Sequence, residues 1–159
     1  QATAFQEALA AAETFSATAE GLVLMDGKGS EVATFTASSQ ELSGTAWTVM
    51  NYNNGREAVV SVIGGTELSA NFGDDGQVSG TAGCNNYFAP FEADAAAGTI
   101  TIGQAGSTMM ACAEPEGIME QEQEFLAALA TAATYRIEGN MLEMRTADDA
   151  LAMMMQLAQ

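Results

Sequence analysis

The sequence predicts an α+β fold: a strongly bent antiparallel β-sheet, or partial β-barrel, plugged by one helix. Between residues 47 and 102, short segments of alternating apolar and polar residues are separated by turns rich in glycine, asparagine and aspartate. This pattern is typical of half-buried strands. Near residue 114 the apolar residues change to a helical period, and three more strand-like segments end the chain. Apolar residues make up 48% of the 159 residues, enough for a buried core.

The expected strands of the main sheet follow one another closely. Regular alternation in the third of them places Leu68, Ala70 and Phe72 on one face. Pro90 cannot donate a hydrogen bond to a neighbouring strand, so it predicts an edge strand or a bulge. The six expected strands are residues 47–52, 58–63, 67–72, 77–81, 87–91 and 99–102.

A helix is expected to begin at Glu114-Pro115-Glu116. Proline suits the first turn of a helix, and acidic residues suit the positive end of its dipole. The closing strands are expected at 134–138, 141–145 and 151–157. The apolar stripe of the helix comprises Ile118, Phe125, Leu126 and Leu129, with Glu122 on the same line.

The chain resembles itself at an offset of 120 residues. Residues 5–24 and residues 125–144 are identical at seven of twenty aligned positions, and Phe15 aligns with Tyr135. The common order is a helix, an aromatic residue, a gap and a leucine, which favours a genuine repeat. We therefore expect residues 1–38 to be the C-terminal third, a helix plus a hairpin, of a preceding unit. Residues 39–159 are expected to form a complete unit.

Charge and residue types exclude several functions. The chain has 21 acidic and 4 basic residues, a net charge of −17, so nucleic acid and anionic membrane surfaces are not expected as partners. Histidine is absent and Lys28 is the only lysine, which excludes serine–histidine, cysteine–histidine and most zinc chemistry. We expect no catalytic residue, cofactor or metal site. The first residues lack the basic start of a signal peptide, so either a signal has been removed or the chain is a fragment.

The chain contains two cysteines, Cys84 and Cys112. A disulfide between them would close a loop of about 29 residues. Two free buried thiols are the alternative. A redox-active pair is disfavoured, because there is no CxxC spacing and no basic neighbour to lower a thiol pKa.

The segments around these cysteines resemble the paired signatures of the META domain, also called the HslJ-like domain. These segments are 80–87, which contains Gly-Cys-Asn, and 108–112. Residues 42–47 resemble the first strand of that family, 119–129 its helix, and Tyr135 with Leu142 its closing hairpin. The resemblance implies a small α+β domain of bacterial envelope or secreted proteins, linked to stress responses and without an assigned activity. It also implies that Cys84 pairs with Cys112. The family motif positions are Trp47, Gly83, Asn85, Thr108, Glu122 and Phe125.

Three functional hypotheses follow. The first is a non-enzymatic module of the periplasm, cell surface or exterior that binds an envelope protein, other copies of itself or a small apolar ligand. The second is a self-assembling protein in which residues 1–38 complete, or exchange with, the sheet of a neighbouring chain. The third is an enzyme that uses two converging carboxyl groups in a pocket. The methionines are expected to fill the core rather than line an apolar groove or bind copper; they include Met109, Met110, Met141, Met144 and 153–155.

Overall fold

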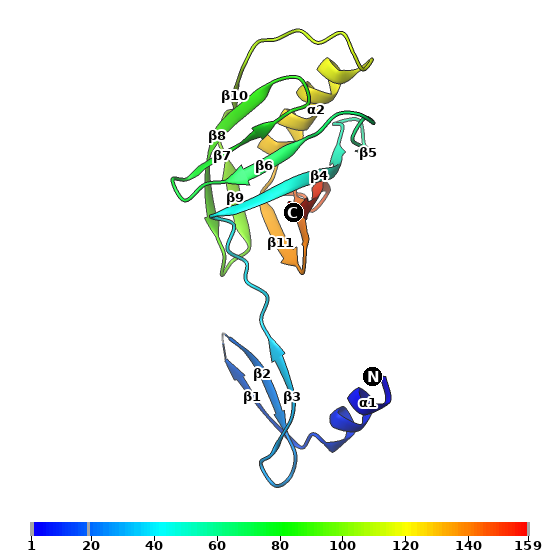
Figure 1. Ribbon diagram of the computed structural model, residues 1–159. Coiled ribbons are helices and arrows are strands. Elements are labelled where there is room, and N and C mark those ends of the chain that lie inside the picture. Colours follow the sequence, from blue (N-terminus) through cyan, green and yellow to red (C-terminus); the bar gives the residue numbers. More distant parts are fainter. Residues whose placement is uncertain (1, 19, 159) are drawn as a thin grey trace. The chain divides into compact units, whose positions relative to one another are not determined.

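The computed structural model describes residues 2–18 and 20–158 and divides the chain into two compact units. The first unit covers residues 1–39 and the second covers residues 40–159. Each unit has its own sheet and its own helix, as Figure 1 shows. The two units are therefore described separately.

The second unit contains most of the regular structure. Its strands and its helix are β4 (Thr45–Asn53), β5 (Val59–Ser61), β6 (Ser69–Phe72), β7 (Gln77–Thr81), β8 (Asn86–Asp94), β9 (Thr99–Ile102), β10 (Gly106–Ser107), α2 (Ile118–Ala130), β11 (Thr134–Glu138), β12 (Met141–Arg145) and β13 (Leu151–Leu157).

Eight strands of this unit form a closed antiparallel barrel within the described residues. The order is β8-β7-β6-β4-β13-β12-β11-β9, and β9 pairs back with β8 through Phe91 and Ile102, among other pairs. The short strands β10 and β5 add to β8 and β4 outside this ring. The predicted fold, a strongly bent sheet with one plugging helix, is confirmed, and the sheet closes. An eight-stranded barrel is just wide enough for side chains to fill it.

Helix α2 closes one end of the barrel (Figure 1). Its Phe125 side chain is fully buried and makes edge-to-face contacts with Tyr52 of β4 and Tyr87 of β8. The helix begins at Ile118, a turn later than the sequence predicts. Gly117, at a positive φ of 87°, reverses the chain just before that residue.

Pro90 lies inside the barrel wall, so the prediction of an edge strand was wrong, but the register shifts by one residue opposite it, between Phe88↔Gly106 and Phe91↔Ile102, as the predicted bulge requires. The strand β8 pairs along one side with β7, where the Phe91 amide donates to Gly76. The Pro90 nitrogen therefore faces the other side of the strand. There β10 pairs with residues 87–88 and β9 with residues 91–94, so Pro90 falls in the gap between two partners. No ladder hydrogen bond is lost at that gap.

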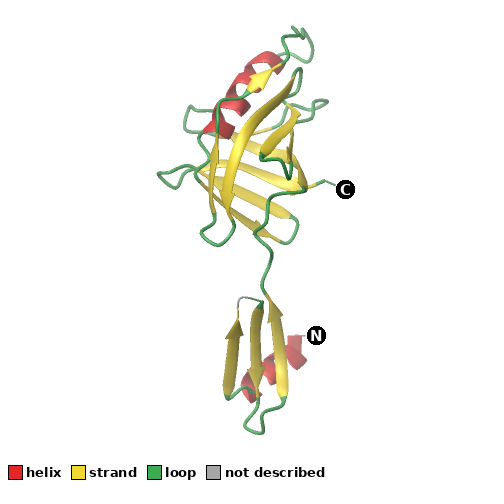
Figure 2. Ribbon diagram, turned by 90° about the vertical axis from the view of Figure 1, so that its left-hand side faces the viewer, coloured by secondary structure: helices red, strands yellow, loops and turns green. Residues whose placement is uncertain are grey.

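The first unit is a helix beside a three-stranded antiparallel sheet, rather than a helix plus a hairpin (Figure 2). The sheet has the order β1-β2-β3, and an aromatic contact joins Phe5 of the helix to Phe35 of the sheet. The elements are α1 (Ala2–Ala11), β1 (Thr14–Thr18), β2 (Gly21–Met25) and β3 (Glu31–Thr36).

The pairing in this small sheet is the same as that of β11, β12 and β13 at an offset of 120 residues. Gly21 pairs with Thr36, as Met141 pairs with Gln156. The register shifts after Leu24 in one sheet and after Met144 in the other. The turn hydrogen bonds also correspond: Asp26 N donates to Ser30 O and Thr146 N to Ala150 O, both at 2.9 Å.

Candidate functional site

Three segments of the second unit meet at Asn85: the β7–β8 turn, the loop 103–117 and helix α2. The Asn85 side chain is 1% exposed and the Glu122 side chain on α2 is also buried. The Asn85 backbone amide donates to Glu122 Oε2 at 2.8 Å, and Asn85 Nδ2 donates to Glu122 Oε1 at 3.0 Å. Each carboxylate oxygen of Glu122 therefore accepts one hydrogen bond from the same asparagine.

The other atoms of the Asn85 amide hold the loop. Its Oδ1 accepts hydrogen bonds from Thr108 Oγ1 and from the Met110 backbone amide, both at 2.7 Å. Its Nδ2 also donates to the Met110 carbonyl at 3.0 Å. The donors and the acceptor of the Asn85 side chain are all used within the protein. We call Asn85, Thr108, Met110 and Glu122 the asparagine clamp.

The disulfide between Cys84 and Cys112 fastens the same loop beside the clamp. Its two Cα atoms are 5.9 Å apart and its sequence separation is 28. The predicted pairing is confirmed, and the alternative of two free thiols is wrong. A structural disulfide fits an oxidising compartment such as the periplasm or the exterior.

Gly83 lets the turn approach helix α2. Its φ of 104° lies in the region that favours glycine, and a Cβ atom there would be 3.1 Å from Gln121 Nε2. Gln121 itself is 1% exposed; it accepts a hydrogen bond from the Ile63 amide at 2.7 Å and donates to Thr66 Oγ1 at 3.0 Å. Sequence reasoning missed Gln121, although it lies beside Glu122 on the inner side of α2.

The two aromatic motif residues, Trp47 and Phe125, lie in the core, and their side chains make no hydrogen bond to the residues of the asparagine clamp. Trp47 is 2% exposed, and its Nε1 donates to Thr45 Oγ1 at 2.7 Å. Phe125 is covered by Tyr52 and Tyr87. Burial and the carboxylate of Glu124 raise the pKa of Tyr52 to about 12, and burial raises the pKa of Tyr87.

A cleft of about 600 Å³ lies between α2, the β4–β5 turn and the β12–β13 turn. Its wall combines apolar side chains such as Val59 with the acidic residues Glu57, Glu124 and Asp148. Glu124 is bound by Arg56 and accepts a hydrogen bond from the Tyr52 hydroxyl. The hydroxyl of Thr146 lowers the pKa of Asp148. A general acid needs a raised pKa, so Asp148 is unsuited to that role.

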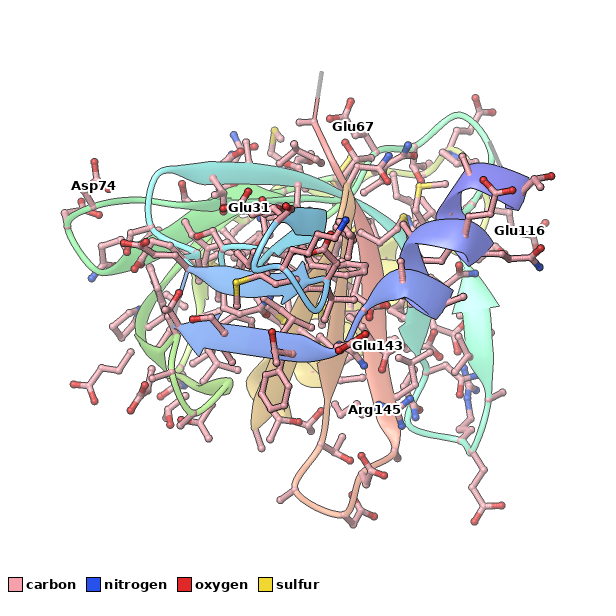
Figure 3. All side chains as sticks on the ribbon, turned by 90° about the horizontal axis from the view of Figure 1, so that it is seen from below. Glu31, Glu67, Asp74, Glu116, Glu143 and Arg145 are labelled. Atoms are coloured by element: carbon pink, nitrogen blue, oxygen red, sulfur yellow. A yellow bond between two sulfur atoms is a disulfide. The ribbon has the colours of Figure 1, made fainter. Side chains whose placement is uncertain are left out.

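Acidic side chains cover the outer surface of the second unit. In Figure 3 the carboxyl groups of Glu67, Asp74 and Glu116 project outward from the ribbon. Glu143 lies beside Arg145, whose Nε donates to it at 2.6 Å. Such a surface is strongly hydrated and repels polyanions.

The methionines expected in the core differ in burial, and Met141 and Met154 are only half-buried. Met144, Met153 and Met155 are fully buried, so the prediction of core filling is confirmed for them. It was wrong for Met109 and Met110, which are 98% and 56% exposed. Asn85 binds the backbone amide and carbonyl of Met110, so this part of the loop is held by its backbone.

The described residues lack two features that would point to a membrane span or a metal site. No helix in residues 2–18 and 20–158 is both long and apolar enough to cross a membrane. The same residues contain no group of three or more histidine, cysteine, aspartate or glutamate side chains placed to hold a metal ion.

Comparison with solved structures shows the same fold at low sequence identity. An NMR structure of a protein from Burkholderia xenovorans is 20% identical, with a TM-score of 0.59, over 74% of this chain and 84% of that one. A second NMR structure is 20% identical, with a TM-score of 0.53, over 77% and 96% of the two chains. A DUF4847 family protein from Bacteroides vulgatus is 16% identical, with a TM-score of 0.50, over 72% and 93%.

The search of curated proteins found no match to the chain. The family model of the META domain matches residues 40–159, which is the whole barrel with its helix and its disulfide. The chain therefore belongs to the META domain family.

Proposed function

We propose that this chain is a non-enzymatic module of the bacterial envelope or exterior, built for structure or binding. The observation that carries this proposal is the asparagine clamp. The polar atoms of the Asn85 side chain and both carboxylate oxygens of Glu122 are bound within the protein. A group that acts on a substrate must be able to reach it.

Family and chemistry support the same proposal. META domains are not known as enzymes, and the chain has no histidine to act as a base. Its one disulfide fits an oxidising compartment. The acidic surface disfavours nucleic acid and anionic membranes as partners. The cleft beside Val59, with its mixed apolar and acidic wall, is where a small, largely apolar ligand would bind.

The proposal is tested by replacing the clamp asparagine and its exposed neighbour. Asn85→Ala keeps the backbone donor to Glu122 but removes the Nδ2 donor to the buried carboxylate and the Oδ1 acceptor of Thr108 and Met110, so the free energy of unfolding should fall by ~2–3 kcal/mol. Asn86→Ala is the matched control, because that side chain is exposed and the change should cost no more than ~0.5 kcal/mol. If Asn85→Ala unfolds at the same denaturant concentration as the control, the clamp is not structural and the proposal loses its support.

A second candidate function is self-association through residues 1–38. The observation in its favour is the apolar surface of the first unit, where Phe15 is 71% exposed. Large exposed apolar patches mark interaction sites. Sedimentation of the 159-residue chain, beside a chain that begins at Ser39, tests this candidate, which requires that the first chain associates and the second does not. Two monomers would refute it.

A further inference from the structure

The first unit has no buried residue among residues 3–18 and 20–39. Its apolar side chains stay largely exposed, although Phe5 contacts Phe35: Phe5 is 49% exposed, Leu9 is 42% exposed and Phe15 is 71% exposed. A ten-residue helix is marginally stable in water by itself, and the three-stranded sheet beside it buries none of its described side chains.

The equivalent side chains of the second unit form its core. At an offset of 120 residues, Phe5, Leu9 and Phe15 correspond to Phe125, Leu129 and Tyr135, which are at most 5% exposed. The strand registers and turns of β1–β3 also correspond to those of β11–β13. The difference in side-chain burial between the two units therefore comes from the elements that cover each three-stranded sheet. The elements that cover the second set therefore show what the first set lacks.

In the second unit the cover is supplied by strands that precede the helix in the chain. The β4 strand pairs with β13, and the β9 strand pairs with β11. Tyr52 and Tyr87, from β4 and β8, enclose Phe125. In the first unit the outer edges of β3 and β1 correspond to the edges of β13 and β11, and its described residues provide no strand for either edge.

We propose that a set of META-type strands, encoded ahead of Gln1 in the same polypeptide, completes the first unit into a second barrel. These strands are the counterparts of residues 41–117. The counterpart of β4 adds to the outer edge of β3, and the counterpart of β9 adds to the outer edge of β1. Residues 1–38 are then the C-terminal third of a preceding META unit. This inference rests on the proposed function in one respect, that META barrels serve here as structural modules repeated along a chain.

A second copy of the chain is a poorer source of these strands. Its β4 and β9 already pair with its own β13 and β11. To release them, that copy would have to expose Met153, Met155 and Leu142, all fully buried. Each such side chain contributes ~1.5–3 kcal/mol by burial. An attached strand set needs no such exchange.

The first test lengthens the full chain. A copy of residues 41–120 is placed ahead of Gln1, since residue 1 is the counterpart of residue 121. Amide hydrogen exchange of β3 should slow by at least about a hundredfold relative to the 159-residue chain, as expected for amides drawn into a closed sheet. The matched control carries Val49→Pro in the added copy alone, which interrupts the strand that pairs with β3 and should restore fast exchange.

Three results would overturn the inference. If the β3 amides of the lengthened chain exchange fast, at the same rate as in the Val49→Pro control, META-type strands do not add to β3. Slow exchange of β3 in the 159-residue chain as a monomer means that the same chain covers this edge. Slow exchange in that chain as a dimer means that a second copy does.

The second test does not depend on whether the lengthened chain folds. Sequencing of the coding DNA ahead of the codon for Gln1 should find the counterparts of Gly44-Thr45-Ala46-Trp47 and of Gly83-Cys84-Asn85. A leader peptide directly ahead of Gln1 would refute the inference. Neither test involves Asn85 or Glu122 of the second unit, so failure here is distinct from failure of the proposed function.

Discussion

Replacing Phe125 by alanine should be among the most destabilising single changes in the barrel. The Phe125 ring is fully buried at the centre of the face that α2 turns toward the strands. It contacts the Tyr52 ring at 6.4 Å and the Tyr87 ring at 5.6 Å between centroids, both edge to face. Alanine would remove both contacts and leave a cavity between the helix and two strands.

The expected loss in the free energy of unfolding is ~4–5 kcal/mol. Burial of a phenylalanine side chain is itself worth ~1.5–3 kcal/mol. The cavity raises the usual cost of such a truncation to ~3–5 kcal/mol, because surrounding atoms collapse only in part. The edge-to-face contacts, each worth ~0.5–1.5 kcal/mol, place this site in the upper part of that range.

Denaturant unfolding followed by tryptophan fluorescence measures this loss. Trp47 is the only tryptophan and is 2% exposed in β4, so its emission reports on the barrel. The chain supplies a matched control, Phe5→Ala, at the counterpart position of α1. Because Phe5 is 49% exposed and lies in the other compact unit, the Trp47 transition should move by no more than ~0.5 kcal/mol.

A loss below ~1 kcal/mol for Phe125→Ala would refute the account of α2 as the plug of the barrel. Equal losses for the two variants would refute a different point, the independence of the two compact units.

Three further outcomes are expected. Replacing Cys84 and Cys112 by serine should lower the free energy of unfolding by ~3.5 kcal/mol on the chain-entropy model. In the unsubstituted chain, thiol titration after denaturation without reduction should find no free thiol. Glu122→Gln should cost ~1–3 kcal/mol in denaturant unfolding, because the amide NH2 that replaces one carboxylate oxygen cannot accept a hydrogen bond from the donor facing it; no change would mean that the carboxylate is not needed. The pKa values of Tyr52, at about 12, and of Tyr87 are raised above that of an unfolded tyrosine, near 10. The stability from these groups is therefore fully present below pH ~10 and lost as pH rises through the folded pKa. Tyrosinate absorbance that appears in full near pH 10, without unfolding, would contradict this.

Much of the barrel could be predicted from local patterns. Strand alternation found β7 and β9 within their observed bounds, because half-buried strands show their two faces directly in the sequence. Ring closure could not be read in this way. The pairing of β8 with β9 and of β9 with β11 depends on contacts between residues far apart in the chain, such as Thr99 with Thr134.

The errors have identifiable physical causes. Pro90 is tolerated inside the wall because two partner strands leave a shifted gap at its nitrogen, so only the edge-strand half of that prediction failed. Met109 and Met110 are apolar, yet the loop that carries them is fixed by its backbone, so their side chains need not be buried.

The candidate site was predicted as a set of positions and not as an arrangement. Family resemblance supplied Asn85, Thr108 and Glu122, but the way one amide group joins a turn, a loop and a helix is a matter of three-dimensional contact. Gln121 was missed because a glutamine on a helix is usually exposed, whereas here it is 1% exposed.

The Met110 backbone amide tests the central claim, that the family motif is a closed structural clamp. This amide donates to Asn85 Oδ1 at 2.7 Å, although the Met110 side chain is exposed. Hydrogen exchange measured by NMR on the oxidised chain should therefore find this amide slowed by at least about a hundredfold relative to an unstructured chain. Exchange near the unstructured rate would contradict the claim. It would mean that the loop opens and leaves Asn85 and Glu122 free to bind or act on something else.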